Sequence, residues 1–196
     1  TLSEVIKVNK IRKGKAEIEN RVLELMETVG LAERLINTYP HELDGGRRQR
    51  IGIARALAME PKFIVSDEPA SAVDVSMQAQ ILNLLKDLQE KMGLSYIFIT
   101  HDLAVVNHIA DEIAVMYLGQ IVEKASTEKL FAKPMHPYTQ ALLSAIPIPE
   151  IIENRPEIIL TSEITSPIDP PDQCRFAKRC PYCTKACLEK TPPLVE

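Results

Sequence analysis

The fold class that we expect for this chain rests on residues 62–102, KFIVSDEPASAVDVSMQAQILNLLKDLQEKMGLSYIFITHD. Two short apolar runs, Phe63–Val65 and Tyr96–Ile99, flank a longer stretch in which apolar residues recur at helical spacing: Met77, Ile81, Leu84, Leu85 and Leu88. Both runs are continuously apolar rather than alternating, which is typical of strands that are covered on both faces. Strand, helix and strand in this order predict a parallel βαβ unit, so the expected fold class is α/β.

The sequence on either side of this segment continues the pattern. Residues 16–30 carry apolar side chains at helical spacing and end in Gly30, and residues 47–60, RRQRIGIARALAME, form a second predicted helix. Downstream, EIAVMYLGQIVEKA (residues 112–125) predicts one or two strands. Its apolar run, Ile113–Leu118, is expected to join the mostly parallel sheet.

Composition is that of a soluble globular protein, and it divides the chain into three parts. The 196 residues are 45% hydrophobic and 26% charged, and the net charge of −4 gives no support to nucleic-acid binding. All seven Gly lie at or before Gly119, eleven of the fourteen Pro lie at or after Pro134, and the four Cys lie between Cys174 and Cys187. We therefore expect a globular part over residues 1–125, a helical and Pro-rich extension over 126–172, and a Cys-rich module over 173–196.

Polar side chains follow the two strands of the expected βαβ unit. Asp67 and Glu68 come directly after the first strand and His101 follows the second, and the carboxyl ends of parallel strands are where such sheets bind ligands. Adjacent residues at a strand end point in different directions, so one acid can hold a hard cation such as Mg²⁺ while its neighbour polarises a water molecule. This division suits hydrolysis of a phosphoanhydride, with His101 stabilising charge on the terminal phosphate.

Three motifs, in the same order, resemble those of ATP-binding-cassette (ABC) ATPases: HELDGGRRQRIGIARALAMEP at 41–61, FIVSDEPASAVD at 63–74 and FITHD at 98–102. They are similar to the signature, the Walker B motif with its D-loop, and the switch histidine of that family. The resemblance implies that Asp67 is the Mg²⁺-linked acid, Glu68 the catalytic carboxylate and His101 the switch histidine. It also implies that the D-loop and the signature contribute further nucleotide-binding residues, namely Asp74, Asp44, Gly45, Gly46 and Arg47.

The C-terminal sequence narrows the resemblance to one subfamily. LFAKPMHPYTQALLSAIP at 130–147, followed by CRFAKRCPYC at 174–183, resembles the extension of oligopeptide and dipeptide importers. The subfamily implies an ATP- and Mg²⁺-dependent ATPase at the cytoplasmic face of the membrane, bound to transmembrane permease subunits and to a second cassette in a homo- or heterodimer. A chromosome-maintenance or DNA-repair ATPase shares the signature and Walker B but lacks the HPYT tail and the Cys module.

The signature departs from the family pattern at two positions. Gly45 and Gly46 let backbone N–H groups approach a phosphate at the start of a helix, but Asp44 stands where the family usually has Ser, and Arg47 where it has Gln. Asp is a good N-cap. A carboxylate about 4 Å from a γ-phosphate, however, costs on the order of 4 kcal/mol at an effective dielectric near 20, roughly a thousandfold in affinity. Arg47 offsets part of this by pairing with Asp44 or with the phosphate, and the sequence leaves both open.

A further departure is that the P-loop pattern Gly-x4-Gly-Lys-Ser/Thr is absent from the 196 residues. In the family this pattern lies upstream of the matched motifs, so the chain is expected to be the C-terminal part of a cassette subunit and to be inactive alone. Two functions remain open. One is the ATPase subunit of a peptide importer, and the other is a catalytically inactive, truncated cassette that acts as a metal-bound interaction module.

The four Cys residues are spaced C-x5-C-x2-C-x3-C at Cys174, Cys180, Cys183 and Cys187. A cytosolic setting disfavours disulfides, and four thiolates suit either a 4Fe-4S cluster or tetrahedral zinc. Some importers of the resembling subfamily carry an iron–sulfur cluster in this region, which favours iron over zinc. Unliganded Cys residues are the remaining alternative.

Overall fold

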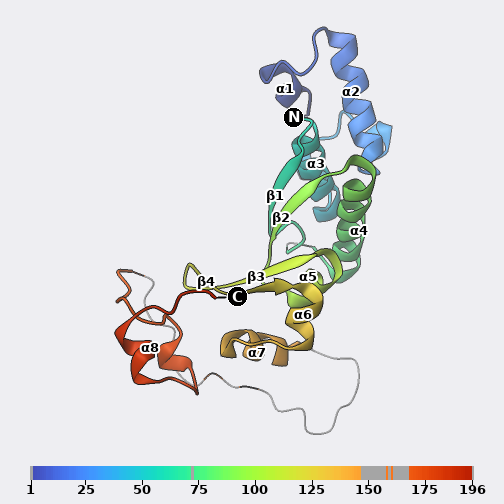
Figure 1. The fold of residues 1–196 in the computed structure, drawn as a ribbon. Helices are drawn as coiled ribbons and strands as arrows, with labels where there is room; N and C mark the ends of the chain where they lie inside the picture. The colour runs from blue at the N-terminus through green and yellow to red at the C-terminus, as the bar shows by residue number, and fades with distance from the viewer. Residues whose placement is uncertain (1, 72, 147–157, 159, 161–167, 196) are drawn as a thin grey trace. The chain divides into compact units, whose positions relative to one another are not determined.

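The fold is described from a computed structural model in which residues 2–71, 73–146, 158, 160 and 168–195 are described (Figure 1). The chain divides into two compact units, Thr1–His101 and Asp102–Glu196, which we call unit 1 and unit 2. Segments 147–157 and 161–167 of the expected Pro-rich extension lie outside the described residues.

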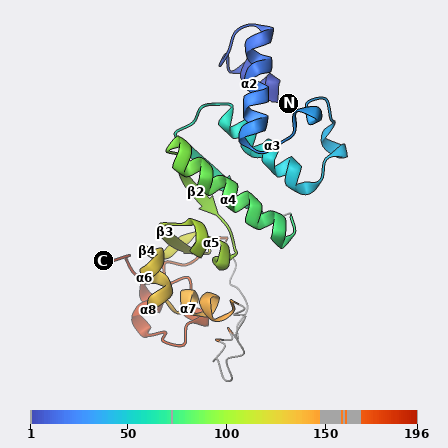
Figure 2. The same ribbon diagram turned by 90° about the vertical axis from the view of Figure 1, so that its right-hand side faces the viewer.

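Unit 1 contains the expected βαβ unit. Strands β1 (Phe63–Asp67) and β2 (Ser95–Ile99) pair in parallel, with Val65 opposite Ile97. Helix α4 (Val75–Met92) connects the two strands and lies beside β2 in both ribbon views (Figures 1 and 2). The prediction made from residues 62–102 is therefore confirmed.

Both ends of α4 are set by the residues that cap it. The Asp74 side chain accepts from the backbone N–H of Met77 at the N-terminus, and Gly93 ends the helix with a φ of 64°. Glycine adopts this left-handed conformation without the strain that a Cβ brings. Between the caps, the buried side chains recur at helical spacing: Ile81, Leu82, Leu85 and Leu88.

Three more helices and two 3-10 turns complete unit 1: α1 (Leu2–Val8), α2 (Lys15–Thr28), η1 (Glu33–Leu35), η2 (Pro40–Glu42) and α3 (Gly45–Leu57). The helices expected near residues 16–30 and 47–60 are α2 and α3. Their apolar faces form one core with α4 and with one face of the sheet, and its members include Ile6, Leu25, Val29, Ala54, Leu57 and Leu88, with Ile64 and Tyr96 of the strands packed against them.

The other face of the β1–β2 sheet is open among the described residues. Its large apolar side chains keep about half of their surface in solvent: Phe63 51%, Val65 58%, Ile97 51% and Ile99 47%. Continuously apolar strands were expected to be covered on both faces, and here one face is covered. The apolar composition shows that both faces suit burial, but it does not show which segment covers each face.

Unit 2 begins with an antiparallel hairpin. Strands β3 (Glu112–Tyr117) and β4 (Gln120–Ser126) are joined by Leu118 and Gly119, whose φ values are 47° and 76°. Two residues with positive φ form the turn that suits the twist of a tight hairpin. The run Ile113–Leu118 was expected to join the parallel sheet, but it pairs with β4 because this turn returns the chain beside the same strand.

The helices of unit 2 pack on one side of this hairpin or lie in the Cys-rich segment: α5 (Leu103–Ile109), α6 (Thr127–Ala132), α7 (Pro137–Ser144), η3 (Ala177–Arg179) and α8 (Lys185–Glu189). The hairpin strand β3 has an alternating burial pattern, as expected for a half-covered strand. Its buried residues pack with α6 and α7 in a second core that includes Ile113, Val115, Leu130, Tyr138 and Leu142.

The Cys-rich segment is anchored to the rest of unit 2 by one aromatic side chain. Phe176 is 1% exposed, and its ring centroid lies 5.2 Å from that of Tyr117 and 5.7 Å from that of Tyr138. The Arg175 guanidinium donates to the carbonyl of Leu118 in the hairpin turn. Residues 175 and 176 therefore tie the segment to β3, to α7 and to the hairpin turn.

Candidate active site

Glu68 and His101 meet at the carboxyl edge of the β1–β2 sheet. The backbone N–H of Glu68 donates to the carbonyl of Ile99 at 2.9 Å, which holds Glu68 beside the end of β2. Its φ of 45° lies in the left-handed region that residues other than glycine rarely occupy, and such strain is typical of functional sites. His101 Nδ1 lies 2.9 Å from Glu68 Oε1. The structure thus brings together the two residues that were expected to be catalytic.

The neighbours of Glu68 keep its carboxylate ionised. The hydrogen bond with His101, followed by one with Ser71, lowers the pKa of Glu68 below its usual value. Because a carboxylate only accepts, Nδ1 of His101 carries the proton in this contact, which leaves Nε2 as the ring nitrogen available to a ligand. Glu68 and His101 are both exposed. An ionised, water-accessible carboxylate is what activation of a water molecule requires.

The two other acids of this region have different surroundings. Asp67 is the last residue of β1 and is exposed next to Glu68. Asp74 accepts from the backbone N–H of Met77 at 2.9 Å and from the Ser76 hydroxyl at 2.7 Å, and these bonds lower the pKa of Asp74. Asp67 is therefore free to take a ligand through its oxygens, whereas Asp74 is already engaged as the cap of α4.

At the signature, Arg47 is paired with Asp44, one of the two partners considered for it. Asp44 is the N-cap of α3, and its Oδ1 accepts from the backbone N–H of Arg47 at 2.7 Å. The guanidinium Nε of Arg47 lies 3.4 Å from Asp44 Oδ2. Asp44 and Arg47, the two signature residues that depart from the family pattern, are thus paired with each other.

Gly46 has a packing role that the sequence did not reveal. It is buried, and a Cβ added to it would lie 1.9 Å from Cε of Met77 in the first turn of α4. The missing side chain lets the starts of α3 and α4 approach each other closely. The two capping aspartates, Asp44 and Asp74, therefore stand at the N-termini of neighbouring helices.

The basic run that follows the glycines divides into two kinds of residue. Arg48 is exposed. Arg50 instead donates through Nη1 to the carbonyl of Val29 at 2.8 Å and through Nη2 to Gln80 at 3.2 Å. Arg50 therefore links the end of α2 to α4, a structural role that no short-range pattern in the sequence predicts.

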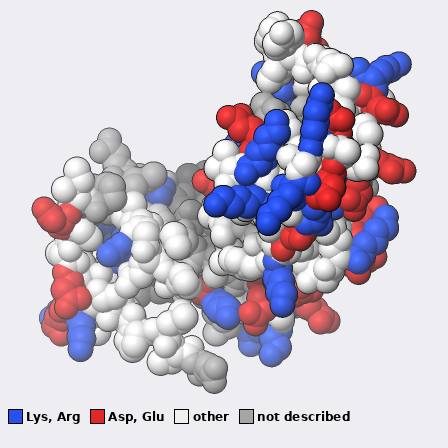
Figure 3. All heavy atoms as spheres, turned by 90° about the horizontal axis from the view of Figure 1, so that it is seen from above, with Lys and Arg blue, Asp and Glu red and all other residues white. Residues whose placement is uncertain are grey.

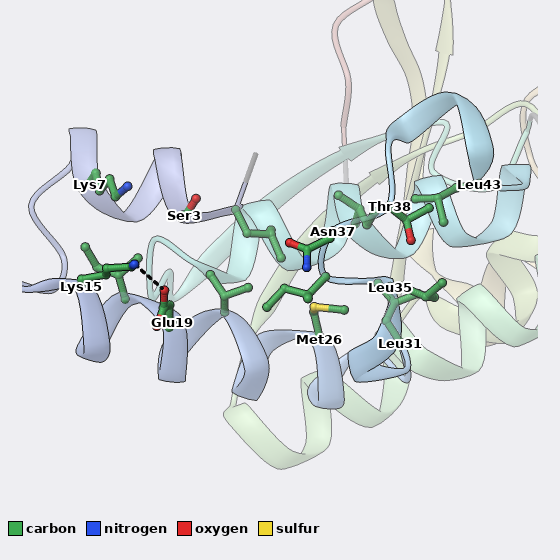
Figure 4. Close-up of a pocket in the computed structure, with 15 residues that line it drawn as sticks. Ser3, Lys7, Lys15, Glu19, Met26, Leu31, Leu35, Asn37, Thr38 and Leu43 are labelled. Carbon is green, nitrogen blue, oxygen red and sulfur yellow. Dashed lines mark ion pairs between the residues drawn. The ribbon is translucent and has the colours of Figure 1, made fainter.

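A pocket of about 320 Å³ opens in unit 1 between α1, α2 and the segment that precedes the signature (Figure 4). Ile18, Val22 and Met26 of α2 belong to its apolar lining. Polar side chains stand at one end, where Lys15 pairs with Glu19 at 3.8 Å and Lys7 of α1 lies nearby. The sequence analysis did not predict this pocket, because its lining comes from three separated segments.

The four thiols lie in one short segment of unit 2 that is closed by its backbone. Cys174 N–H donates to the Cys187 carbonyl at 2.8 Å, and Cys183 N–H donates to the Cys180 carbonyl at 3.3 Å. Desolvation, and then the neighbouring thiols of Cys187, Cys180 and Cys174, raise the pKa of Cys183. All four thiols are free. In the described part of the chain, no group of three or more His, Cys, Asp or Glu side chains has the geometry to hold a metal ion.

Two family models match the chain, one over an N-terminal part that includes Glu68 and one over a C-terminal part. Residues 2–71 match the ABC transporter family, and residues 122–187 match the C-terminal region of oligopeptide/dipeptide transporters. The oligopeptide transport ATP-binding protein OppF of Escherichia coli is 50% identical over 197 residues, which cover 100% of this chain and 59% of OppF. The chain belongs to the ABC transporter ATPases. Within this family it carries the C-terminal region typical of oligopeptide and dipeptide transporters.

Other ABC proteins extend the comparison. The dipeptide transport ATP-binding protein DppF of Haemophilus influenzae is 53% identical over 91% of this chain and 54% of DppF. Among solved structures, CbiO1 of Clostridium perfringens superposes with a TM-score of 0.59 at 28% identity, over 68% of this chain and 53% of CbiO1. A dimeric ATP-binding cassette with bound ADP and phosphate gives 0.53 at 34% identity, over 59% of this chain and 50% of that one.

The ABC chain described here spans less than two thirds of the length of OppF or DppF. Within the described residues, none of the helices combines the length and the apolar character that crossing a bilayer requires.

Proposed function

We propose that this chain is the catalytic-carboxylate part of an ATPase subunit that powers import of oligopeptides or dipeptides. The contact between Glu68 and His101 at the end of the parallel strands carries the proposal, because it places an ionised carboxylate and an imidazole at one point. The relatives named for oligopeptide and dipeptide transport support the choice of substrate class.

In the proposed reaction, a water molecule attacks the γ-phosphorus of ATP, and the bond from that phosphorus to the β–γ bridging oxygen breaks to give ADP and phosphate. Glu68 accepts a hydrogen bond from the attacking water and draws electron density towards its oxygen. His101 presents Nε2 to the γ-phosphate and stabilises its developing charge. Mg²⁺ supplies further charge neutralisation when bound, and the exposed carboxylate of Asp67 fits the role of an oxygen ligand.

A second cassette is the proposed partner for the signature. Asp44, Gly45, Gly46 and Arg47 start a 13-residue helix, and the partial positive charge of its N-terminus suits a phosphate held by the opposite subunit. Transmembrane permease subunits are the other proposed partners, and the proposed location is the cytoplasmic face of the membrane. The alternative, an inactive interaction module, rests on the absent P-loop.

The chain alone is expected to show no Mg-ATP hydrolysis above background, because it lacks the glycine–lysine loop that cradles the phosphates. Fused after a P-loop-bearing segment of an ABC ATPase, the same 196 residues are expected to hydrolyse ATP. Phosphate release by both proteins is the measurement. Turnover by the chain alone that Glu68→Gln abolishes would contradict the expectation, and a fusion that binds ATP without hydrolysing it would favour the interaction module.

The proposal extends to a metal centre at Cys174, Cys180, Cys183 and Cys187, a 4Fe-4S cluster in preference to zinc. It is supported by four thiols in a segment whose ends are hydrogen-bonded together. Apart from Phe176, the large apolar side chains of this segment are exposed, Tyr182 at 69% and Leu188 at 52%. Burial alone therefore offsets little of the entropy of ordering it, and a bound metal would supply the missing free energy.

Anaerobically purified protein is expected to be brown and to contain iron and acid-labile sulfide. Cys180→Ser should abolish the colour and loosen residues 180–191, while residues 175 and 176 stay anchored on β3 and α7. Metal analysis and hydrogen exchange of the two proteins are the measurements. Colourless protein with one zinc per chain would replace the cluster by zinc, and protein with neither metal but an equally protected segment would refute the centre.

A further inference from the structure

The turn between α1 and α2 concentrates positive charge in a chain that is acidic overall. Residues 7–15, KVNKIRKGK, hold five basic side chains and no acidic ones, whereas the net charge of the chain is −4. We call residues 7–15 the basic turn. Seen from the end of unit 1 where α1 and the start of α2 lie, Lys and Arg side chains gather on the surface with Asp and Glu side chains beside them (Figure 3), and the Glu17 carboxylate accepts from the backbone N–H of Lys13 at 3.2 Å. This gathering makes the turn a candidate interaction surface.

The basic turn is an ordered structure. Asn9 donates to the carbonyl of Val5 through both its backbone N–H, at 3.2 Å, and its side-chain amide, at 2.9 Å. The N–H of Ile11 donates to the carbonyl of Ile6 at 3.0 Å, and the Ile11 side chain packs against the core of unit 1. The turn is therefore held from the inside, and ligand binding to its outer side chains does not have to order the backbone first.

The single guanidinium in the basic turn is already engaged. Arg12 lies 2.5 Å from Glu60 through Nη2 and donates through Nη1 to the carbonyl of Ile11 at 2.8 Å. The charges that remain are ammonium groups. Lys7, Lys10 and Lys13 are exposed and form no ion pair within the described residues, and Lys15 has only the exposed pair with Glu19 at 3.8 Å.

We infer that the basic turn binds the headgroups of anionic phospholipids. Compact ammonium charges on flexible stems suit a diffuse anionic surface, whereas bidentate recognition of a single phosphate needs a free guanidinium. Val8, between the lysines, is 73% exposed, and an apolar side chain at the tip of a basic surface can enter the headgroup region. Residues 7–15 include no aromatic side chain on which a nucleic-acid base could stack.

This contact adds to the proposed function, which already places the chain at a membrane face, but it does not depend on ATP hydrolysis. Each lysine close to an anionic leaflet strengthens binding about fivefold at low salt. At an ionic strength near 0.1 M, salt screens charges over about 10 Å and so weakens the attraction between each lysine and the leaflet. Losing three lysines is therefore expected to weaken vesicle binding by at least about tenfold, and added salt should do the same.

The test is sedimentation of the full 196-residue chain with phosphatidylcholine vesicles, with and without phosphatidylglycerol, in the absence of nucleotide. The test variant carries Lys7→Gln, Lys10→Gln and Lys13→Gln. The matched control carries Lys62→Gln, Lys86→Gln and Lys91→Gln, which remove the same charge from other exposed positions of unit 1. Binding is expected only with phosphatidylglycerol, to weaken in the test variant and to persist in the control.

Three results would overturn the inference. The first is failure of the unsubstituted chain to bind phosphatidylglycerol vesicles, and the second is an equal loss in the test and control variants. The third is a competition result, in which poly-glutamate displaces the bound chain from the vesicles at a lower concentration of negative charge than added phosphatidylglycerol vesicles do. That result would assign the turn to an acidic protein partner. Because no arm of the test uses ATP, a negative result leaves the proposed ATPase function unaffected.

Discussion

Glu68→Gln is expected to lower ATP turnover by about 10²- to 10⁴-fold when this chain is fused to a P-loop-bearing segment, the usual range for loss of a general base. The amide keeps the size of the side chain but can no longer draw a proton from the attacking water. Nucleotide affinity should change little, because Glu68 acts on water and not on the bound phosphates. Single-turnover phosphate release, with ATP binding measured in parallel, separates the two effects.

The companion variant His101→Ala tests the geometry of the pair. The hydrogen bond with His101 is the largest of the causes that lower the pKa of Glu68. Removing it should raise that pKa, so the acid limb of the pH–rate profile should move to higher pH, because Glu68 must be ionised to act as a base. An unshifted acid limb, or Glu68→Gln turnover within a fewfold of the unsubstituted protein, would contradict the assigned roles.

Arg47→Gln is expected to weaken ATP-driven dimerisation of the fused cassette by up to about a thousandfold, the unscreened cost of a carboxylate about 4 Å from a phosphate. The substitution removes the guanidinium whose Nε lies 3.4 Å from Asp44 Oδ2, and it leaves that acid unneutralised where we propose that it faces the γ-phosphate held by the partner. Light scattering across an ATP titration, in the Glu68→Gln background that prevents hydrolysis, gives the dimerisation constant.

A double-mutant cycle provides the control for this pair. Asp44→Ser alone should strengthen dimerisation, since it frees Arg47 to face the phosphate. Asp44→Ser combined with Arg47→Gln restores the usual family residues and should remove most of the penalty. If Arg47→Gln alone leaves dimerisation unchanged, Asp44 does not approach the phosphate and the charge argument is wrong.

The fold of unit 1 could be predicted because the spacing of the apolar residues and the residues that begin and end the helices indicate the same elements. Continuous apolar runs at 63–65 and 96–99 and helical spacing between them predicted β1, α4 and β2. The same reasoning misassigned Ile113–Leu118 to the parallel sheet, since an apolar run does not reveal its partner. The decisive residues were Leu118 and Gly119, whose positive φ values turn the chain back on itself.

The parts of the candidate site that depend on the order of the motifs could be predicted from the sequence. The parts that depend on contacts between residues far apart in the sequence could not. The sequence placed Glu68 and His101 at the ends of the two strands, and in the structure the two side chains are in contact. The bond of Arg50 to Val29 and the burial of Phe176 against Tyr117 join positions more than twenty residues apart, and no local pattern encodes them. Ser71, three residues after Glu68, also lowers the pKa of Glu68 through a hydrogen bond. Nothing in the sequence pattern singled out this serine.

The absent side chain of Gly46 sets how closely the start of α3 approaches the start of α4. Met77 occupies the space that a Cβ at position 46 would need, so a shift of either helix start presses directly on the other. In a head-to-tail pair of cassettes, the signature at the start of α3 would sense one ATP, while the D-loop at the start of α4 would lie near the dimer seam. In the proposed pair of cassettes, the contact between Gly46 and Met77, together with the hydrogen bond from Arg50 of α3 to Gln80 of α4, would transmit a shift at one helix start to the other.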